Sequence, residues 1–292
     1  MVMIKINKSA QYTLFLFSLC MVLFSCQKFD KPGLGEYVKD ANAPGGPLKF
    51  YVAFDGTTTN PLMNAVDSIR ANFAANNPLA TINGVSGKAV QGAAGKAIKY
   101  NSPNDFVKNI SSYSVSVWLK NNIPANDEFE TVFSLAHDDL YYKQAIHFDV
   151  YPGNWGSTTS SANGYFYTEQ PDGSYFDFEL NGSSAMPNLL NGQWHHLVIT
   201  YDETNSSFKF YVDAVLCATK VWTGHGPFVI NSSKVLGLAV AGPNRNAGLP
   251  APDDAGRDSW MYSWKGGLDQ LRLYGKKVLT AAEVSVLFSS KL

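Results

Sequence analysis

Two adjacent histidines, His195 and His196, begin the apolar alternation of 194-WHHLVITY-201. Paired histidines suggest a zinc site, because an imidazole nitrogen is a preferred zinc ligand. In an extended strand, however, neighbouring side chains point to opposite sides of the sheet. The pair therefore cannot bind one ion from a regular strand, and the other histidines have no H-x-x-x-H or H-x-H spacing with it. We predict packed or edge histidines and no zinc site.

Carboxylates two residues apart are a second candidate for chemistry. Asp177 and Glu179 share one face of a predicted strand, and so do Glu128 and Glu130. Retaining hydrolysis of a glycosidic bond uses two carboxyl groups about 5 Å apart, which this spacing can reach. Exposed strand faces carry the same pairs routinely. We therefore assign no catalytic residue and keep a glycoside hydrolase as the alternative to a binding protein.

Asp269 is a third candidate, because in 268-LDQLRLY-274 it shares a face with two leucines. A carboxylate on the core side of a strand must be protonated, paired or bound to a cation. Two interpretations stay open. Asp269 binds a metal ion, or it caps backbone amides or pairs with Arg272 or Lys265.

Three segments between predicted strands combine aromatic rings with polar side chains, a mixture suited to sugar rings and their hydroxyl groups. They are 137-HDDLYY-142, 152-PGNWGSTTSSANG-164 and 242-GPNRNAGLPAPDDAGRDSW-260. The third is long and lacks strand signals, and such loops are often functional. The other interpretation is that each aromatic side chain packs against the fold. From these segments we select as candidate ligand-binding residues Asp138, Tyr142, Trp155, Asn244, Arg245 and Trp260.

Short segments of alternating apolar residues must position these groups. Clusters of Gly, Asn, Asp and Ser separate the segments, and helical periodicity is scarce. Such a series predicts an all-β fold built as a two-sheet antiparallel sandwich. The predicted strands cover residues 48–54, 96–100, 113–120, 129–135, 145–151, 164–169, 174–180, 194–201, 208–214, 235–241 and 268–274.

Two short helices are predicted as well. In 279-LTAAEV-284, Thr280 and Glu283 have the spacing of a capping box, and Leu279 can pack against Val284. This C-terminal helix would run to about residue 289. Helical spacing of apolar residues also predicts a helix over 62–73.

The N-terminus has the pattern of a bacterial lipoprotein signal. A basic start precedes 14-LFLFSLCMVLF-24, and Ser25 precedes Cys26 as in a lipobox. We predict a signal peptide over 1–25, lipid on Cys26 and a Gly/Pro-rich tether over 26–47. The domain would then span 48–292. Acyl chains on Cys26 would anchor the protein to the bacterial outer membrane, surface-exposed or facing the periplasm.

The mature chain is close to neutral. Loss of Lys5 and Lys8 leaves 21 basic against 24 acidic residues, a net charge of −3. The sequence has no basic run, so we expect no nucleic-acid partner. Only Cys217 remains as a free thiol, which excludes a disulfide within the mature chain.

Three segments together resemble the laminin-G-like jelly-roll domains of the concanavalin A-like lectin and glucanase superfamily. The segment 192–214 resembles the family's Trp-His strand followed by a strand and turn of the form YVDG. The segment 267–288 resembles its last strand and the capped helix after it, and 84–101 resembles its early glycine-containing segment. Ala214 replaces the turn glycine, so we expect a different turn or a bulge there.

The resemblance implies a jelly roll with a structural calcium ion near its first and last strands. Asp55 at the end of the first strand and Asp269 are the implied ligands, with Thr57, Asn60 or Asp67 as further donors. The superfamily's glucanases carry an E-x-D-x-x-E strand, which is absent here. We therefore expect a non-catalytic carbohydrate-binding protein that recognises a glycan through loops or the concave sheet face. A protein-binding adhesion or scaffold domain is the alternative.

Overall fold

The computed structural model of this protein describes residues 46–55, 65–66, 69–70, 72–122, 127–152, 159–254 and 256–291. The predicted signal peptide, Cys26, most of the tether, Trp155 and the additional donors considered for calcium lie outside these residues. No helix among the described residues is long and apolar enough to span a lipid bilayer.

Short strands dominate the fold, as the alternation predicts. The strands are β1 (Leu48–Val52), β2 (Ala65–Val66), β3 (Ile69–Arg70), β4 (Ala80–Asn83), β5 (Lys88–Gln91), β6 (Ile98–Tyr100), β7 (Tyr113–Asn122), β8 (Phe129–His137), β9 (Gln144–Pro152), β10 (Ala162–Glu169), β11 (Tyr175–Leu180), β12 (Asn191–Asp202), β13 (Ser207–Val212), β14 (Val215–Val221), β15 (Val235–Val240), β16 (Met261–Ser263) and β17 (Gly267–Gly275). The helices are α2 (Asn104–Val107), η2 (Gly182–Ser184), η3 (Ser232–Lys234), η4 (Asn244–Ala247) and α3 (Ala281–Ser290).

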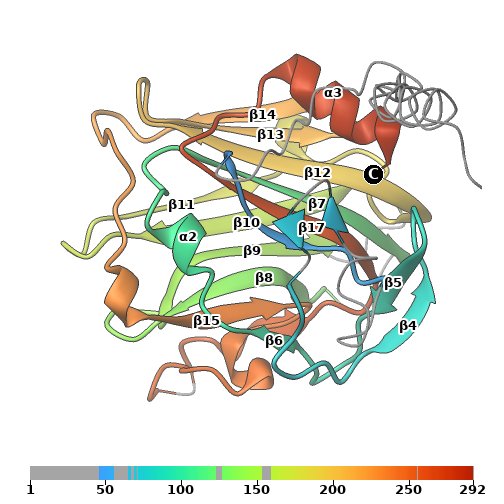
Figure 1. Cartoon of the computed structure of the whole chain (residues 1–292), viewed down its shortest axis with the longest axis horizontal. Helices are drawn as coiled ribbons and strands as arrows, with labels where there is room; N and C mark the ends of the chain where they lie inside the picture. The colour runs from blue at the N-terminus through green and yellow to red at the C-terminus, as the bar shows by residue number, and fades with distance from the viewer. Residues whose placement is uncertain are drawn as a thin grey trace, which may run out of the picture. The chain divides into compact units, whose positions relative to one another are not determined.

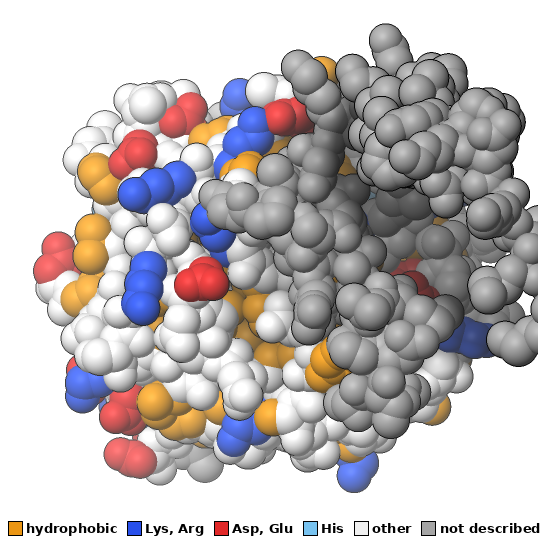
Figure 2. Space-filling model, in the orientation of Figure 1, with side chains coloured by type: hydrophobic (Ala, Val, Ile, Leu, Met, Phe, Trp, Pro, Cys, Tyr) orange, Lys and Arg blue, Asp and Glu red, His pale blue; other side chains and the backbone are white. Residues whose placement is uncertain are grey.

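Two sheets lie over one another as a sandwich (Figure 1). The first sheet has the order β14-β13-β12-β7-β17-β5-β4, with β1 beside β17. The second has the order β11-β10-β9-β8-β15-β6, with β16 beside β8. Their pairing is antiparallel except between β16 and β8. The predicted all-β, two-sheet antiparallel sandwich is therefore confirmed. Acidic and basic side chains of the described residues are interspersed on the face in Figure 2.

Alternation along each strand fills the space between the sheets. Val115 and Val117 of β7 and Leu197 of β12 enter one core with Phe148 of β9 and Phe166 of β10. Burying an apolar side chain of this size contributes about 1.5–3 kcal/mol. This core holds the strands in one register, which also determines which side chains point to the opposite face of each sheet.

Helix α3 covers the outer face of the first sheet. Thr280 and Glu283 form the predicted capping box, in which each side chain accepts a hydrogen bond from the backbone of the other residue. Leu279 and Val284 are both buried in a smaller apolar cluster that includes Val198 of β12. The predicted C-terminal helix is confirmed.

The helix predicted over 62–73 is wrong. Two short strands form there instead, with Ala65 paired to Arg70 and Val66 to Ile69. Val66 and Ile69 are β-branched residues that favour extended backbone, and a helix of this length is marginal without tertiary packing. The helical spacing of the apolar residues did not outweigh this preference.

His195 and His196 make separate contacts, as expected from their opposite directions. The His195 ring contacts Asp213 and Asn191, at 2.7 and 2.9 Å. The His196 ring lies 2.8 Å from the Ser116 hydroxyl and packs against Trp118 under α3. Both histidines therefore have structural partners and do not converge on one point.

The turn between β13 and β14 keeps its two-residue form despite Ala214. Val212 pairs with Val215, and the central residues have φ of 50° at Asp213 and 65° at Ala214. The different turn or bulge that we expected at Ala214 does not form there, and the register shifts instead between Phe210 and Tyr211. A left-handed conformation at a non-glycine residue costs roughly 1–2 kcal/mol.

We expect Ala214→Gly to raise the free energy of unfolding by about 0.5–1 kcal/mol. Glycine removes the left-handed strain, and its greater freedom in the unfolded chain offsets part of the gain. Chemical denaturation measures the change. Ala185→Gly is a matched control that should lower stability, because Ala185 has an ordinary φ of −59°. Unchanged or reduced stability of Ala214→Gly would contradict the expectation.

Candidate functional site

The outer face of the second sheet carries aromatic side chains over β9, β10 and β11. In β10, Phe166 enters the core, whereas Tyr165, Tyr167 and Glu169 face outward. In β11, the register places Asp177 beside Tyr167. Both faces of β10 are therefore aromatic, which is unusual for a sheet face that needs only to be solvated.

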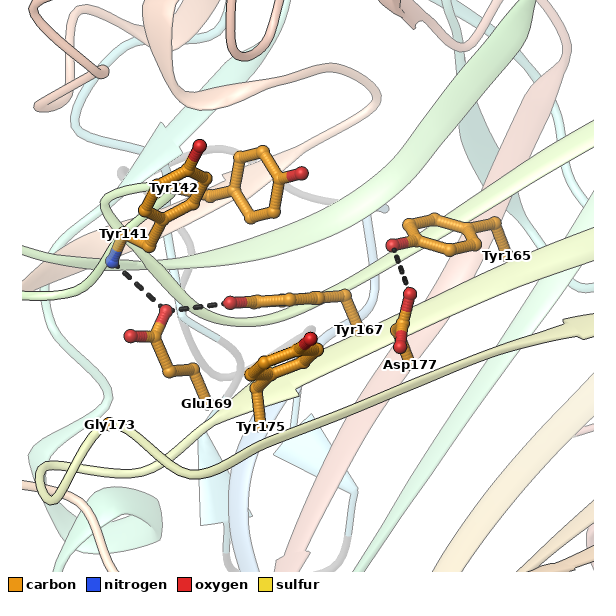
Figure 3. A pocket seen from close by; sticks show the side chains of 8 residues that line it. All are labelled: Tyr141, Tyr142, Tyr165, Tyr167, Glu169, Gly173, Tyr175 and Asp177. Carbon is orange, nitrogen blue, oxygen red and sulfur yellow. Dashed lines mark hydrogen bonds between the residues drawn. The ribbon is translucent and has the colours of Figure 1, made fainter.

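A pocket of about 480 Å³ opens on this face, within the size range of ligand sites. The β8–β9 hairpin forms one side of the pocket, and β10 and β11 form the other (Figure 3). Its described lining residues are Tyr141, Tyr142, Tyr165, Tyr167, Glu169, Gly173, Tyr175 and Asp177. We call this feature the tyrosine pocket.

The tyrosine rings meet at defined angles. The ring centres of Tyr142 and Tyr167 lie 4.9 Å apart, with the planes at 87°, so these two rings form a corner. Tyr175 lies nearly parallel to Tyr167, at 6.1 Å and 21°. Perpendicular and parallel ring pairs of this kind are attractive and hold the rings in place.

Both carboxylates of the pocket are positioned by hydrogen bonds. Glu169 Oε2 accepts one from the Tyr167 hydroxyl at 2.7 Å and one from the Tyr141 backbone N–H at 3.0 Å (Figure 3). Asp177 Oδ2 accepts one from the Tyr165 hydroxyl at 3.1 Å. The pocket therefore presents ordered carboxylate oxygens between aromatic rings.

The segment 242–260 covers the neighbouring part of the same sheet face. Ala247 and Leu249 pack on Ala97, Ala136 and Ala239, which are small residues of the outer face. The covered part of the sheet is thus occupied by the protein itself, and the tyrosine-rich part stays open.

Two anchors fix this segment, a half-buried Arg245 and a buried Asn244. Arg245 forms an ion pair of 2.9 Å with Asp258 and donates hydrogen bonds to the backbone carbonyls of Asp258 and Met261. Asn244 is fully buried and contacts the Ser134 hydroxyl and the Lys143 carbonyl, each at 2.9 Å. In this conformation the side chains of Asn244 and Arg245 therefore serve the fold.

Trp260 ends the covering segment at the edge of the pocket. Its ring contacts Tyr142 and Tyr165, with ring centres 6.3 and 5.5 Å away. Close by, the Arg257 guanidinium lies 4.3 Å from the centre of the Tyr141 ring. Trp260 and Arg257 extend the site beyond the residues that line the cavity.

A fully buried histidine and aspartate lie beneath the rings. His147 stacks on Tyr167 at 5.1 Å, and its Nε2 lies 3.4 Å from Asp149 Oδ2. Burial lowers the pKa of His147 to about 3 and raises the pKa of Asp149 to about 8. Desolvation disfavours both charged forms, so at neutral pH the pair is neutral, with the proton on Asp149.

The ligand-binding residues predicted from the sequence differ in where they lie relative to the pocket. Tyr142 lines the pocket and Trp260 borders it. Asp138 is half-buried on the same β8–β9 hairpin, where its carbonyl accepts a hydrogen bond from Lys143, and it is not among the lining residues. Asn244 and Arg245 anchor the covering segment, and Trp155 lies outside the described residues.

Most of the pocket was missed at the level of sequence. The sequence places Tyr165, Tyr167 and Tyr175 in predicted strands and does not mark them as ligand-binding residues. The sequence 164-GYFYTE-169 does indicate the pocket, because its aromatic residues fall on both faces of the predicted strand and not on one. One face of such a strand must expose its aromatic rings or cover them with another segment.

The two carboxylate pairs have different surroundings. Lys265 forms ion pairs with both Glu128 and Glu130, so this pair is engaged within the fold. Asp177 and Glu179 are both exposed on the outer side of β11. Only Asp177 of these four residues lines the pocket.

Asp55 and Asp269 meet at the turn between β4 and β5. Asp269 Oδ2 accepts a hydrogen bond from the Val85 backbone N–H at 2.7 Å, and Asp55 Oδ1 accepts one from the Lys88 backbone N–H. A Cβ atom on Gly84 would lie only 2.3 Å from Asp269 Oδ2, so the turn approaches the carboxylate closely because this residue is glycine. Capping of a backbone amide by Asp269 was one of the two interpretations left open.

This pair also fits a hard cation. Asp269 is fully buried, and its Oδ1 has no hydrogen-bond partner among the described residues. Burial, with a smaller contribution from the charge of Asp55, raises the pKa of Asp269 to about 7. Within the described ranges, no group of three or more His, Cys, Asp or Glu side chains could hold a metal ion. Backbone carbonyls or other oxygens would therefore have to complete a calcium site.

Comparisons with known proteins agree with the geometry. The laminin-G profile described as the concanavalin A-like lectin/glucanases superfamily matches residues 93–285. No curated protein matches the sequence.

Solved structures share the fold at low sequence identity. The binding domain of a Paraclostridial mosquitocidal protein aligns with a TM-score of 0.52 at 12% identity, over 84% of this chain and 52% of that one. Domain 4 of an arabinanase from Geobacillus stearothermophilus, solved with arabinotriose, aligns with a TM-score of 0.49 at 21% identity, over 82% and 97%. Because the profile match spans more than half of the sequence, the chain belongs to the concanavalin A-like lectin/glucanase superfamily.

Proposed function

We propose that this protein is a non-catalytic carbohydrate-binding lipoprotein of the bacterial cell envelope, and that the tyrosine pocket is its glycan site. The observation that carries the proposal is the set of five tyrosines and two carboxylates around one open cavity. Aromatic rings pack against the apolar faces of sugar rings, and carboxylate oxygens accept hydrogen bonds from sugar hydroxyls. Two of the five rings, Tyr141 and Tyr175, are 52% and 61% exposed, and exposed patches of this kind often mark binding sites.

The anchoring part of the proposal comes from the sequence. The basic start, the apolar run and the Ser25-Cys26 pair support lipid attachment at Cys26. Two or more acyl chains would hold the domain stably on a membrane, and the tether would separate it from the lipid surface.

We also propose that Asp55 and Asp269 hold a structural calcium ion. The positive charge of the ion would offset the repulsion between the two carboxylates, which lie near a tight turn. Asp269 belongs to the last strand and Asp55 follows the first, so the ion would join the two ends of the domain.

Binding to a glycan array followed by single substitutions tests the glycan site. We expect Tyr175→Ala and Trp260→Ala each to weaken saccharide binding about tenfold, the effect of losing roughly 1.4 kcal/mol of ring contact. Tyr175 is 61% exposed, so its loss should leave the fold intact.

Tyr262→Ala is the matched control, because Tyr262 is 42% exposed on β16 and does not line the pocket. Its binding should equal that of the unmodified protein. Equal losses in all three variants would place the site elsewhere. If the unmodified protein releases reducing sugar and Asp177→Asn does not, the function is hydrolysis and not binding alone.

A further inference from the structure

The tyrosine pocket carries negative charge. Among the described residues that line it, Glu169 and Asp177 are acidic and none is basic. Asp172 adjoins the lining residue Gly173, and Glu179 shares the exposed side of β11 with Asp177. A ligand with acidic groups would meet these carboxylates at close range, which is unfavourable.

Both lining carboxylates retain an oxygen for a ligand. The two hydrogen bonds to Glu169 both reach Oε2, and Oε1 points away from them (Figure 3). The Tyr165 hydroxyl reaches only Oδ2 of Asp177. Glu169 is 7% exposed, so its carboxylate oxygen is largely shielded from water. A shielded carboxylate gains most from a charged donor, because charge-assisted hydrogen bonds are roughly twice as strong as neutral ones.

The rings around these oxygens suit a cation as well. An ammonium group is attracted to the face of a tyrosine ring within about 6 Å of its centre. Tyr175 is 61% exposed and Tyr142 is half-buried, so both can present ring surface to a ligand, whereas Tyr167 is 4% exposed and stacks on His147. At the rim, the Arg257 guanidinium already occupies the face of Tyr141 at 4.3 Å. The edge of the tyrosine pocket thus already binds one cationic group of the protein, the Arg257 guanidinium.

We propose that the tyrosine pocket selects glycans that carry free amino groups, in preference to N-acetylated, neutral or acidic glycans. The proposal rests on the proposed glycan-binding function and names its ligand class. The protonated amine of the sugar donates to Glu169 Oε1 or Asp177 Oδ1 and lies against the tyrosine rings. The sugar ring itself packs on the exposed face of Tyr175.

Calorimetric titration of the full chain with two matched oligosaccharides tests this selection. A glucosamine tetrasaccharide and an N-acetylglucosamine tetrasaccharide share one backbone and differ in charge. At about pH 6, where the free amines are mostly protonated, we expect the glucosamine form to bind about tenfold tighter. This preference should shrink as salt is added, because screening weakens the exposed part of the charge interaction.

Asp177→Asn and Glu169→Gln separate the charge from the shape of the pocket. We expect each variant to lose most of the preference for the free amine, measured as the ratio of the affinities for the two tetrasaccharides. Asp177 is exposed, so its variant is not expected to unfold. Asp105→Asn, an exposed acid in α2, is the control and should keep the full preference.

Three results would overturn the proposal. They are equal affinity for the two tetrasaccharides, tighter binding of the acetylated or an acidic form, and an unchanged preference in both Asp177→Asn and Glu169→Gln. If acetylated or neutral glycans bind and Tyr175→Ala weakens them, the glycan-binding function stands and only the amine selection fails. If no glycan binds at all, both fail together.

Discussion

Chelation of a calcium-replete sample is expected to lower the free energy of unfolding by about 4 kcal/mol, the stabilisation given by a ligand at about a thousand times its Kd. The ion would bind the folded chain through Asp55 and Asp269, whereas the unfolded chain separates these residues. Its removal leaves Asp269 buried with one carboxylate oxygen lacking a hydrogen-bond partner among the described residues. Thermal or chemical denaturation with and without chelator measures the difference.

Asp269→Asn distinguishes a bound ion from a general effect of the chelator. The variant should show no response to chelator, and without calcium it should be at least as stable as the unmodified protein, because it carries no buried charge. Asp253→Asn, an exposed acid of the covering segment, should respond like the unmodified protein. A melting temperature that chelator leaves unchanged would count against the ion.

The buried pair of His147 and Asp149 is expected to make the protein less stable above pH 6.5. The unfolded-state pKa values are 6.5 and 3.8, and the folded-state values are about 3 and about 8. Between pH 3.8 and 6.5 both states bind one proton on this pair, so the pair contributes no slope. From pH 6.5 to 8 only the folded state keeps its proton, and stability falls by about 1.4 kcal/mol per pH unit, or about 2 kcal/mol in all.

Asp149→Asn should remove this loss on the alkaline side. In the variant only His147 of this pair titrates, and its lowered pKa makes the pair's contribution to stability fall from pH 6.5 downward instead of staying level. Denaturant midpoints measured from about pH 4 to about pH 8 compare the two proteins. Parallel curves over that range would mean that the pair does not carry its proton on Asp149.

The sequence predicts the long elements and misses the short exposed ones. Strong alternation located the long strands β7 and β12, and the capping box located α3. β4 and β14 escaped because most of their side chains are exposed and give no clear alternation. Their positions depend on pairing with β5 and β13, which is a tertiary effect.

The pocket was less predictable than the fold for a physical reason. It is formed by a hairpin and by strands that follow later in the chain. Strand pairing places Tyr167 between His147 and Asp177, and this register cannot be predicted from local sequence patterns. Tyr142 and Trp260 could be predicted because they are aromatic residues in loops, and binding residues often lie in loops. Asn244 and Arg245 lie in a loop of similar composition, but their side chains form hydrogen bonds and an ion pair within the protein.

The segment 242–260 packs on small alanines and not on the interior between the sheets. It sets how much of the outer face remains uncovered, and its apolar residues lie outside the main core between the sheets. Under the proposed function, ligand recognition would thus depend on residues outside the core between the sheets. Exchanging this insertion, with its Arg245–Asp258 anchor retained, offers a route to new specificities on an unaltered scaffold.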